Sequence, residues 1–261
     1  MSSFNWCCLP GLVLCLTACT AKPSANGDSA AHVLGATEAQ AAFAALVDAD
    51  HWRERNATRD RLVALGRSAL PLVLAGTEHA VVEVRRICHE ILRQRHALEP
   101  EALARIIAGL DDEDWGFIAY PSAFHLGEHV LEAGREPLRA LLARGELPER
   151  LRAAAQKSLG ELGELQMAPA LWWGLGSDDA YTRYLSNLGM RGLTGRDLME
   201  FDYTSPWEGA FVSGPNVVTM QGLPVEKARA RVERWSAVER FTLWLAEERP
   251  QVFAELEGAL W

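Results

Sequence analysis

Two histidines and a glutamate in His125-Leu126-Gly127-Glu128-His129 have the spacing of metal ligands. Residues four apart on a helix share a face, so His125 and His129 would point the same way, with Glu128 beside them. Imidazole nitrogens and carboxylate oxygens are ligands that Zn²⁺ accepts, and a glutamate next to a metal-bound water can act as a base. This segment is therefore the best candidate for chemistry in the chain.

The pattern H-x-x-E-H resembles the zinc motif of the inverzincin peptidases, which implies zinc on His125 and His129 and Glu128 as the base. Two observations favour another interpretation. Inverzincins use a large α/β domain, for which this chain has no room. The run Leu126-Gly127-Glu128 also matches Leu159-Gly160-Glu161 further along, so a repeat explains part of the motif. We therefore expect no metal and no cofactor, and we keep the three residues as an alternative metal site.

Other familiar catalytic patterns are missing from the sequence. The pair His89-Glu90 lacks the second histidine of H-E-x-x-H, and neither a P-loop nor a G-x-S-x-G motif occurs. The acidic run from Asp111 to Asp114 lacks the glycine and the final glutamate of a calcium-binding loop. We expect its carboxylates to complement the dipole of the helix that follows.

Length and composition favour one or two helical domains. The chain has 261 residues, of which 49% are apolar, and the Val/Ile/Thr alternation of strands is scarce. The formal net charge of −9 argues against a nucleic-acid partner, because an acidic surface repels phosphates. We therefore expect an all-α protein that does not bind nucleic acid.

Paired helices recur with a spacing of roughly 30 to 35 residues, a period typical of stacked repeats. A Leu-Gly pair stands near the end of first helices: Leu65-Gly66, Leu126-Gly127 and Leu159-Gly160. A proline stands in the first turn of second helices: Pro71, Pro137 and Pro169. The glycine lets the chain turn or lets helices approach closely, and the proline is harmless in a first turn. The predicted helices are 37–47, 52–65, 68–75, 81–95, 100–110, 115–131, 136–143, 148–162, 167–175, 180–193, 224–248 and 252–260.

The third and fourth pairs carry the repeat pattern most fully. The residues that define it are Arg152, Ala154, the run Leu159-Gly160-Glu161-Leu162-Gly163, Pro169, Leu171, Leu175 and Asp178. On these residues the chain resembles the HEAT-like repeat family from about Asp50 to Thr194. The resemblance implies a right-handed α-solenoid of about four to five helix pairs over 37–195, whose concave surface holds a protein partner. Some relatives are bilin lyases or other enzymes, so the fold alone does not exclude catalysis.

The N-terminus predicts an export signal followed by a lipid anchor. Residues 1–18 contain an apolar run that is too short to span a bilayer. Their ending, Leu16-Thr17-Ala18-Cys19, resembles the lipobox of bacterial lipoproteins; an ordinary secretory signal and a buried N-terminal helix are the alternatives. The resemblance implies cleavage before Cys19, acylation of Cys19 with fatty acids such as palmitate, and delivery to the outer membrane, since Thr20 is not Asp. Residues 19–36 are rich in small residues, and we expect a flexible tether there.

The repeat pattern stops at Gly195, and we expect residues 196–261 to cap the open end of the stack. Stacked helix pairs expose an apolar end face that must be covered. The aromatic residues suited to that role are Trp207, Trp235, Phe241 and Trp244. Alternatively, the loop 202–222 folds over the groove and helps to form a pocket.

These observations predict a lipid-anchored scaffold that binds a protein partner in the bacterial envelope and has no catalytic activity. Trp173 is expected to reach the concave surface, because exposed tryptophans often mark binding sites; packing against the adjoining unit is the alternative. The arginines expected to line the same surface are Arg105, Arg139 and Arg144. The alternative function is an enzyme or small-ligand receptor with a pocket beside the C-terminal loop, including metal binding through His125, Glu128 and His129.

Overall fold

The structure is a computed structural model that describes residues 25–201 and 224–260. Over these ranges every regular element is helical, which confirms the all-α prediction. No helix within the described part is both long and apolar enough to cross a membrane. The predicted signal peptide (1–18), the lipidation site Cys19 and the whole 202–222 loop, including Trp207, lie outside the described residues.

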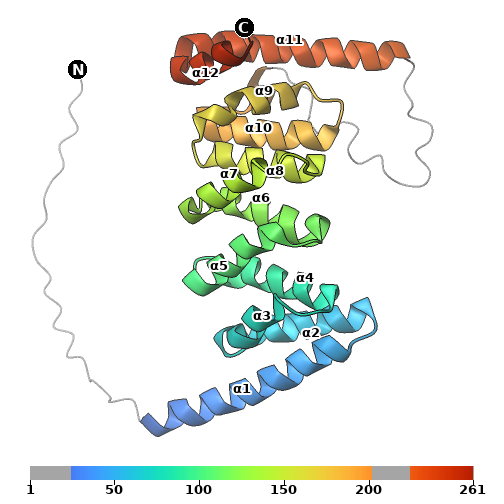
Figure 1. The fold of residues 1–261 in the computed structure, drawn as a ribbon, viewed down its shortest axis with the longest axis vertical. Coiled ribbons are helices and arrows are strands. Elements are labelled where there is room, and N and C mark those ends of the chain that lie inside the picture. Colours follow the sequence, from blue (N-terminus) through green and yellow to red (C-terminus); the bar gives the residue numbers. More distant parts are fainter. Residues whose placement is uncertain (1–24, 202–223, 261) are drawn as a thin grey trace, which may run out of the picture.

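Twelve α-helices in the described part are stacked along the long axis, from α1 at one end to α11 and α12 at the other (Figure 1). They follow chain order except that α9 lies beyond α10, next to α11 and α12. They are α1 (Ala25–Asp48), α2 (Trp52–Leu65), α3 (Leu70–Gly76), α4 (Val82–Ile91), α5 (Pro100–Ala108), α6 (Tyr120–Glu128), α7 (Arg135–Leu142), α8 (Glu149–Glu161), α9 (Ala168–Leu175), α10 (Ala180–Thr194), α11 (Pro224–Glu248) and α12 (Pro250–Leu260). From α2 to α9, each even-numbered helix is followed by a shorter one. The predicted succession of longer and shorter helices is therefore present.

Helix α1 begins well before its predicted start. The sequence suggested a flexible tether over 19–36 and a helix N-terminus at Thr37, but residues 25–36 are already helical and Thr37 lies inside α1. Those two expectations are wrong for this segment. Alanine has the highest helix propensity, and no proline interrupts the chain between Pro23 and Pro71, so the small residues continue the helix.

The glycines of the Leu-Gly pairs serve two different purposes. Gly66 ends α2 with a φ of 52°, a conformation that L side chains rarely adopt. Gly127 and Gly160 have no such φ and instead allow helices to touch. A Cβ on Gly127 would lie 2.4 Å from the Cα of Ser158, and one on Gly160 would lie 2.8 Å from the carbonyl oxygen of Gly189. Glycine is therefore needed where α6, α8 and α10 pack together.

The C-terminal helices cover the last helix pair of the stack. Phe241 and Leu245 of α11 are fully buried in a cluster that joins α11 and α12 to α9 and α10. Trp235 and Trp244 pack against the same cluster and are partly buried. Burying a Phe or Leu side chain contributes about 1.5–3 kcal/mol, so this contact fixes α11 on the stack.

Candidate functional site

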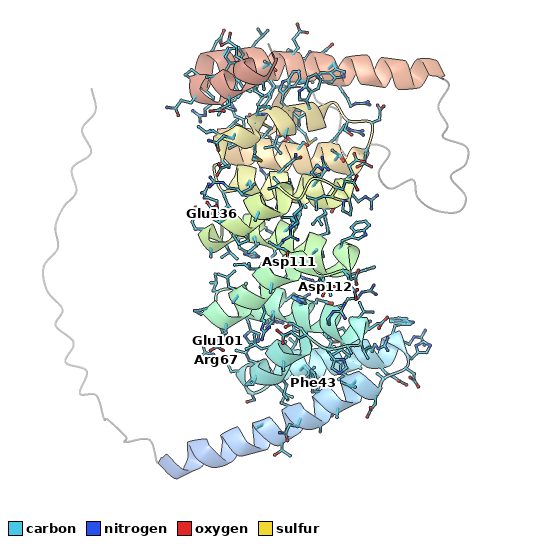
Figure 2. The ribbon with its side chains drawn as sticks, viewed as in Figure 1. Phe43, Arg67, Glu101, Asp111, Asp112 and Glu136 are labelled. Atoms are coloured by element: carbon cyan, nitrogen blue, oxygen red, sulfur yellow. The ribbon has the colours of Figure 1, made fainter. Side chains whose placement is uncertain are left out.

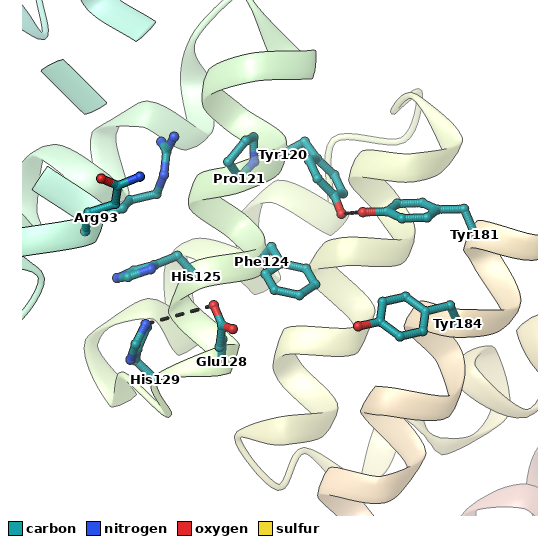
Figure 3. Close-up of a pocket in the computed structure, with 10 residues that line it drawn as sticks. Arg93, Tyr120, Pro121, Phe124, His125, Glu128, His129, Tyr181 and Tyr184 are labelled. Carbon is teal, nitrogen blue, oxygen red and sulfur yellow. Dashed lines mark hydrogen bonds and ion pairs between the residues drawn. The ribbon is translucent and has the colours of Figure 1, made fainter. Parts of the chain in front are cut away.

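A solvent-open pocket of about 530 Å³ lies on the side of the stack, between the end of α4, helix α6 and helix α10. We call it the tyrosine pocket, because three of the chain's four tyrosines line it. Its lining residues are Arg93, Gln94, Tyr120, Pro121, Phe124, His125, Glu128, His129, Tyr181 and Tyr184 (Figure 3). Aromatic surface combined with a few polar groups is the usual composition of a binding site.

Two turns that depart from regular α-helical geometry hold part of this lining in place. The π-helical turn Leu92–His96 continues α4 and carries Arg93 and Gln94. A second π-helical turn, Trp115–Ala119, leads into α6 at Tyr120. The sequence predicted uninterrupted helices over 81–95 and 115–131, so these turns correct that expectation. Turns of this kind are rare and occur often at functional sites.

Tight packing around α8 brings α6 and α10 to the pocket. The buried side of α8 consists mainly of small residues, among them Ala154, Ser158 and Gly160. Because these small side chains let α6 and α10 approach each other beside α8, the hydroxyl groups of Tyr120 on α6 and Tyr181 on α10 form a hydrogen bond. Their ring centroids are 5.9 Å apart (Figure 3). A contact between residues 61 positions apart thus closes one side of the pocket.

The three residues of the histidine motif lie together at the edge of the pocket. One ligand atom from each of His125, Glu128 and His129 lies within 4.8 Å of the others. The two imidazole centroids are 4.2 Å apart, and Nε2 of His129 is 3.9 Å from Oε2 of Glu128 (Figure 3). His125 is only 6% exposed, whereas about half of the other two side chains is exposed. The side chain of His125 is therefore held in place by its surroundings, whereas the side chains of Glu128 and His129 have room to move.

Burial and nearby positive charges change the ionisation of the groups at this edge. Burial, together with the positive charges of His129, Arg93 and Lys157, lowers the pKa of His125 to about 4. Burial lowers the pKa of Arg93 to about 10, and the attraction of Glu90 only partly opposes this. At neutral pH, His125 is therefore an uncharged imidazole, and Arg93 remains a cation.

A buried lysine lies behind the aromatic wall of the pocket, which consists of Tyr120, Phe124, Tyr181 and Tyr184. Lys157 is 1% exposed, and its Nζ lies 3.5 Å from the ring centroid of Phe124 and 2.7 Å from Oε2 of Glu161. The same Nζ donates a hydrogen bond to the carbonyl oxygen of Phe124 at 3.3 Å. Burial lowers the pKa of Lys157 and raises that of Glu161. This pair holds Phe124 in place at the pocket wall.

The arginines predicted to bind a partner form ion pairs that connect distant parts of the stack. Each pairs with a carboxylate 25 to 33 residues away in the sequence. The pairs are Arg105 with Glu78, Arg144 with Asp111, and Arg139 with Glu164. None of the three arginines lines the tyrosine pocket.

The acidic loop takes part in the same pairing. Asp112 and Asp111 lie near the middle of the stack (Figure 2), and Asp112 is 3.0 Å from Nε of Arg85. Burial opposes ionisation of Asp112, but hydrogen bonds from Arg85 and the backbone of Asp114 outweigh it and lower the pKa. Asp114 also accepts a hydrogen bond from the backbone N–H of Phe117, as a helix N-cap does. The loop therefore both starts a helix and joins units.

Trp173 is 56% exposed and also packs within the chain. Its ring makes edge-to-face contacts with Trp172 at 5.0 Å and with Trp235 of α11 at 6.0 Å. The indole N–H of Trp172 donates to Oγ1 of Thr242 at 2.8 Å. Trp173 thus lies beside the C-terminal helices and not in the tyrosine pocket.

The aromatic wall and Lys157 were not predicted from the sequence. A signal was present, because Tyr120 and Phe124 have i, i+4 spacing and Tyr181 and Tyr184 have i, i+3 spacing, which place each pair on one helical face. Their meeting depends on the contact of two helices across α8, which no local pattern reports. Neither a scan against protein-family models nor a search of curated proteins finds a match for this chain.

Proposed function

We propose that the chain is a lipoprotein of the bacterial envelope, anchored through Cys19, whose body binds a segment of a partner protein in the tyrosine pocket. The body would be a right-handed α-solenoid of about four to five HEAT-like pairs with a C-terminal cap. The regular succession of longer and shorter helices and the ion pairs between distant parts of the stack support this architecture. The ending Leu16-Thr17-Ala18-Cys19 supports the anchor, and Thr20, which is not Asp, supports the outer membrane as its destination.

The observation that carries the binding proposal is the convergence of four half-buried aromatic rings on one open pocket. Tyr120 and Phe124 come from α6, and Tyr181 and Tyr184 come from α10. Tyrosines dominate many protein interfaces, because a rigid amphipathic ring gives a large contact area with little loss of conformational entropy. A side chain of a partner inserted between these rings would bury much of that area.

Arg93 indicates the charge of the expected partner. It lines the pocket and forms no ion pair within the described part of the chain, unlike the three arginines that were predicted to bind a partner. Its Nη1 is buried and has no hydrogen-bond partner among the described residues. A carboxylate would satisfy this group through a charge-assisted hydrogen bond. The fitting segment therefore carries an aromatic or aliphatic side chain close to an acidic one.

A small-molecule ligand is the second candidate for the same pocket. Perturbed ionisable groups in a cleft are typical of ligand-binding and catalytic sites, and His125 and Arg93, which both line this pocket, show such shifts. An anionic aromatic compound would match the rings and Arg93. This candidate differs from the alternative expected from the sequence, because its pocket lies between α4, α6 and α10.

Affinity capture from detergent-solubilised envelopes tests the proposal. The tagged full-length chain is compared with Tyr184→Ala and Arg93→Gln. The matched control is Phe117→Ala, which removes an exposed ring next to α6 that does not line the pocket. A hot-spot ring contributes at least ~2 kcal/mol, so Tyr184→Ala should weaken capture of the partner roughly 30-fold. Capture that Phe117→Ala and Tyr184→Ala reduce equally, while both unfold at the wild-type temperature, would rule out the pocket.

A further inference from the structure

We propose that His125, Glu128 and His129 form a binding site for one divalent transition-metal ion, Zn²⁺, at the edge of the tyrosine pocket. The site uses only side chains of this chain, so the zinc proposal can be tested independently of the partner proposed above. Two imidazoles and one carboxylate form a donor set that suits zinc, and they leave at least one coordination position open toward the pocket.

The geometry needs only a small adjustment to bind the ion. Ligand atoms bound to one zinc at about 2.0–2.1 Å lie roughly 3.3 Å from one another. The three ligand atoms here lie within 4.8 Å of one another without an ion. Glu128 and His129 are half exposed at the end of α6, so their side chains can swing inward while the buried His125 stays in place.

A buried, unpartnered nitrogen points independently to a ligand. His125 is 6% exposed, and its Nε2 has no hydrogen-bond partner within the described residues. A buried polar atom is nearly always satisfied in a folded protein, because leaving it without a partner is unfavourable. Coordination of a metal ion, after a small turn of the ring where needed, would supply a partner for an imidazole nitrogen at this position.

The repeat pattern does not account for the two histidines. Leu126-Gly127-Glu128 corresponds to Leu159-Gly160-Glu161 in the next pair of helices, and Gly127 is explained by the approach of α8. In the same alignment, however, His125 corresponds to Ser158 and His129 to Leu162. The repeat pattern thus does not call for a histidine at either position, and the two imidazoles are specific to this unit.

An occupied site would change the charge of the pocket. Arg93 is close enough to lower the pKa of His125, so it opposes the binding of a cation, whereas Glu128 favours it. A bound Zn²⁺ would add positive charge beside Arg93. The pocket would then attract a carboxylate more strongly, both through the open coordination position and through the guanidinium group.

The test is zinc binding to the full-length chain, purified in detergent through a tag without histidines and stripped with a chelator. Titration with ZnCl₂ is followed by calorimetry, and Co²⁺ substitution is followed by visible absorption, which reports direct ligation. The variants are His129→Gln and Glu128→Gln, which change exposed side chains, and the control is His51→Gln, an exposed histidine elsewhere.

We expect one Zn²⁺ per chain, at least ~10-fold weaker binding in His129→Gln and in Glu128→Gln, and unchanged binding in His51→Gln. No heat and no cobalt spectrum with the wild-type chain would overturn the proposal, and so would equal binding by His129→Gln and the wild type. Tyr184→Ala should bind zinc as the wild type does. Loss of capture without loss of zinc therefore separates the two proposals.

Discussion

Replacing Gly127 by alanine adds one methyl group where α6 touches α8. A Cβ at this position would lie 2.4 Å from the Cα of Ser158 and 2.5 Å from its Oγ. Because part of the obstacle is backbone, rotating the Ser158 side chain does not relieve it, and the helices must move apart. Overpacking costs about 1–3 kcal/mol, and a backbone obstacle places this case near the upper end. Alanine's better helix propensity offsets up to ~1 kcal/mol, so we expect a net loss of about 2 kcal/mol.

Thermal unfolding of the full-length chain, followed by far-ultraviolet circular dichroism, measures this loss. For a chain of this size, a loss of about 2 kcal/mol lowers the midpoint by roughly 4–8 °C. The matched control is Gly258→Ala in α12, where no heavy atom lies within 4 Å of the added methyl. That variant should unfold at the wild-type temperature or slightly above. If Gly127→Ala did the same, α6 and α8 would not be in close contact, and the account of how the pocket is positioned would fail.

Three further predictions concern a buried neutral histidine, a buried ion pair and the anchor. Burial lowers the pKa of His89 to about 4, so between about pH 6.5 and 4 the unfolded chain binds a proton that the native chain does not. In urea denaturation, the stability advantage of the wild type over His89→Asn should therefore fall by up to about 1.4 kcal/mol per pH unit on acidification. A difference in stability that stays constant with pH would contradict the lowered pKa. Lys157→Met should cost about 3 kcal/mol by leaving Glu161 unpaired, and adding Glu161→Leu should recover most of it in a double-mutant cycle, whereas additive losses would argue against the pair. Cys19→Ser should move the protein from the membrane fraction to the soluble fraction, and continued membrane retention would argue against lipidation.

Much of the helical layout could be predicted from sequence, because helix periodicity and the positions of proline and glycine are local signals. Helices α2 and α11 begin and end where the pattern placed them, α9 and α10 differ by one residue at one end, and α8 differs by one residue at each end. The early start of α1 was missed, because small residues that are typical of tethers also include the strongest helix former, alanine.

Only the part of the candidate site whose residues are close in sequence could be predicted from the sequence. The histidine motif could be found because its residues are close in sequence, at the end of one helix. The aromatic wall joins α6 to α10 through a contact between residues 61 positions apart. Its position depends on the small side chains of α8, which let the helices approach closely, and only the packed structure reveals this. The ion pairs of Arg105 and Arg144, which were expected to line the partner-binding surface, were not foreseen for a related reason. Their carboxylate partners lie in other units, so local spacing gave no sign of the pairing.

Site-specific photocrosslinking in living cells tests the central claim, that the tyrosine pocket holds a segment of a partner protein. A photoreactive phenylalanine analogue replaces Tyr184 in one strain and Phe117 in another, and crosslinked products are identified by mass spectrometry. Both sites carry an aromatic ring, but only Tyr184 lines the pocket. We predict that a single envelope protein crosslinks at position 184 and not at position 117, and that the crosslinked peptide contains an acidic residue beside an apolar one. No crosslink at position 184, or the same products at both positions, would contradict the claim.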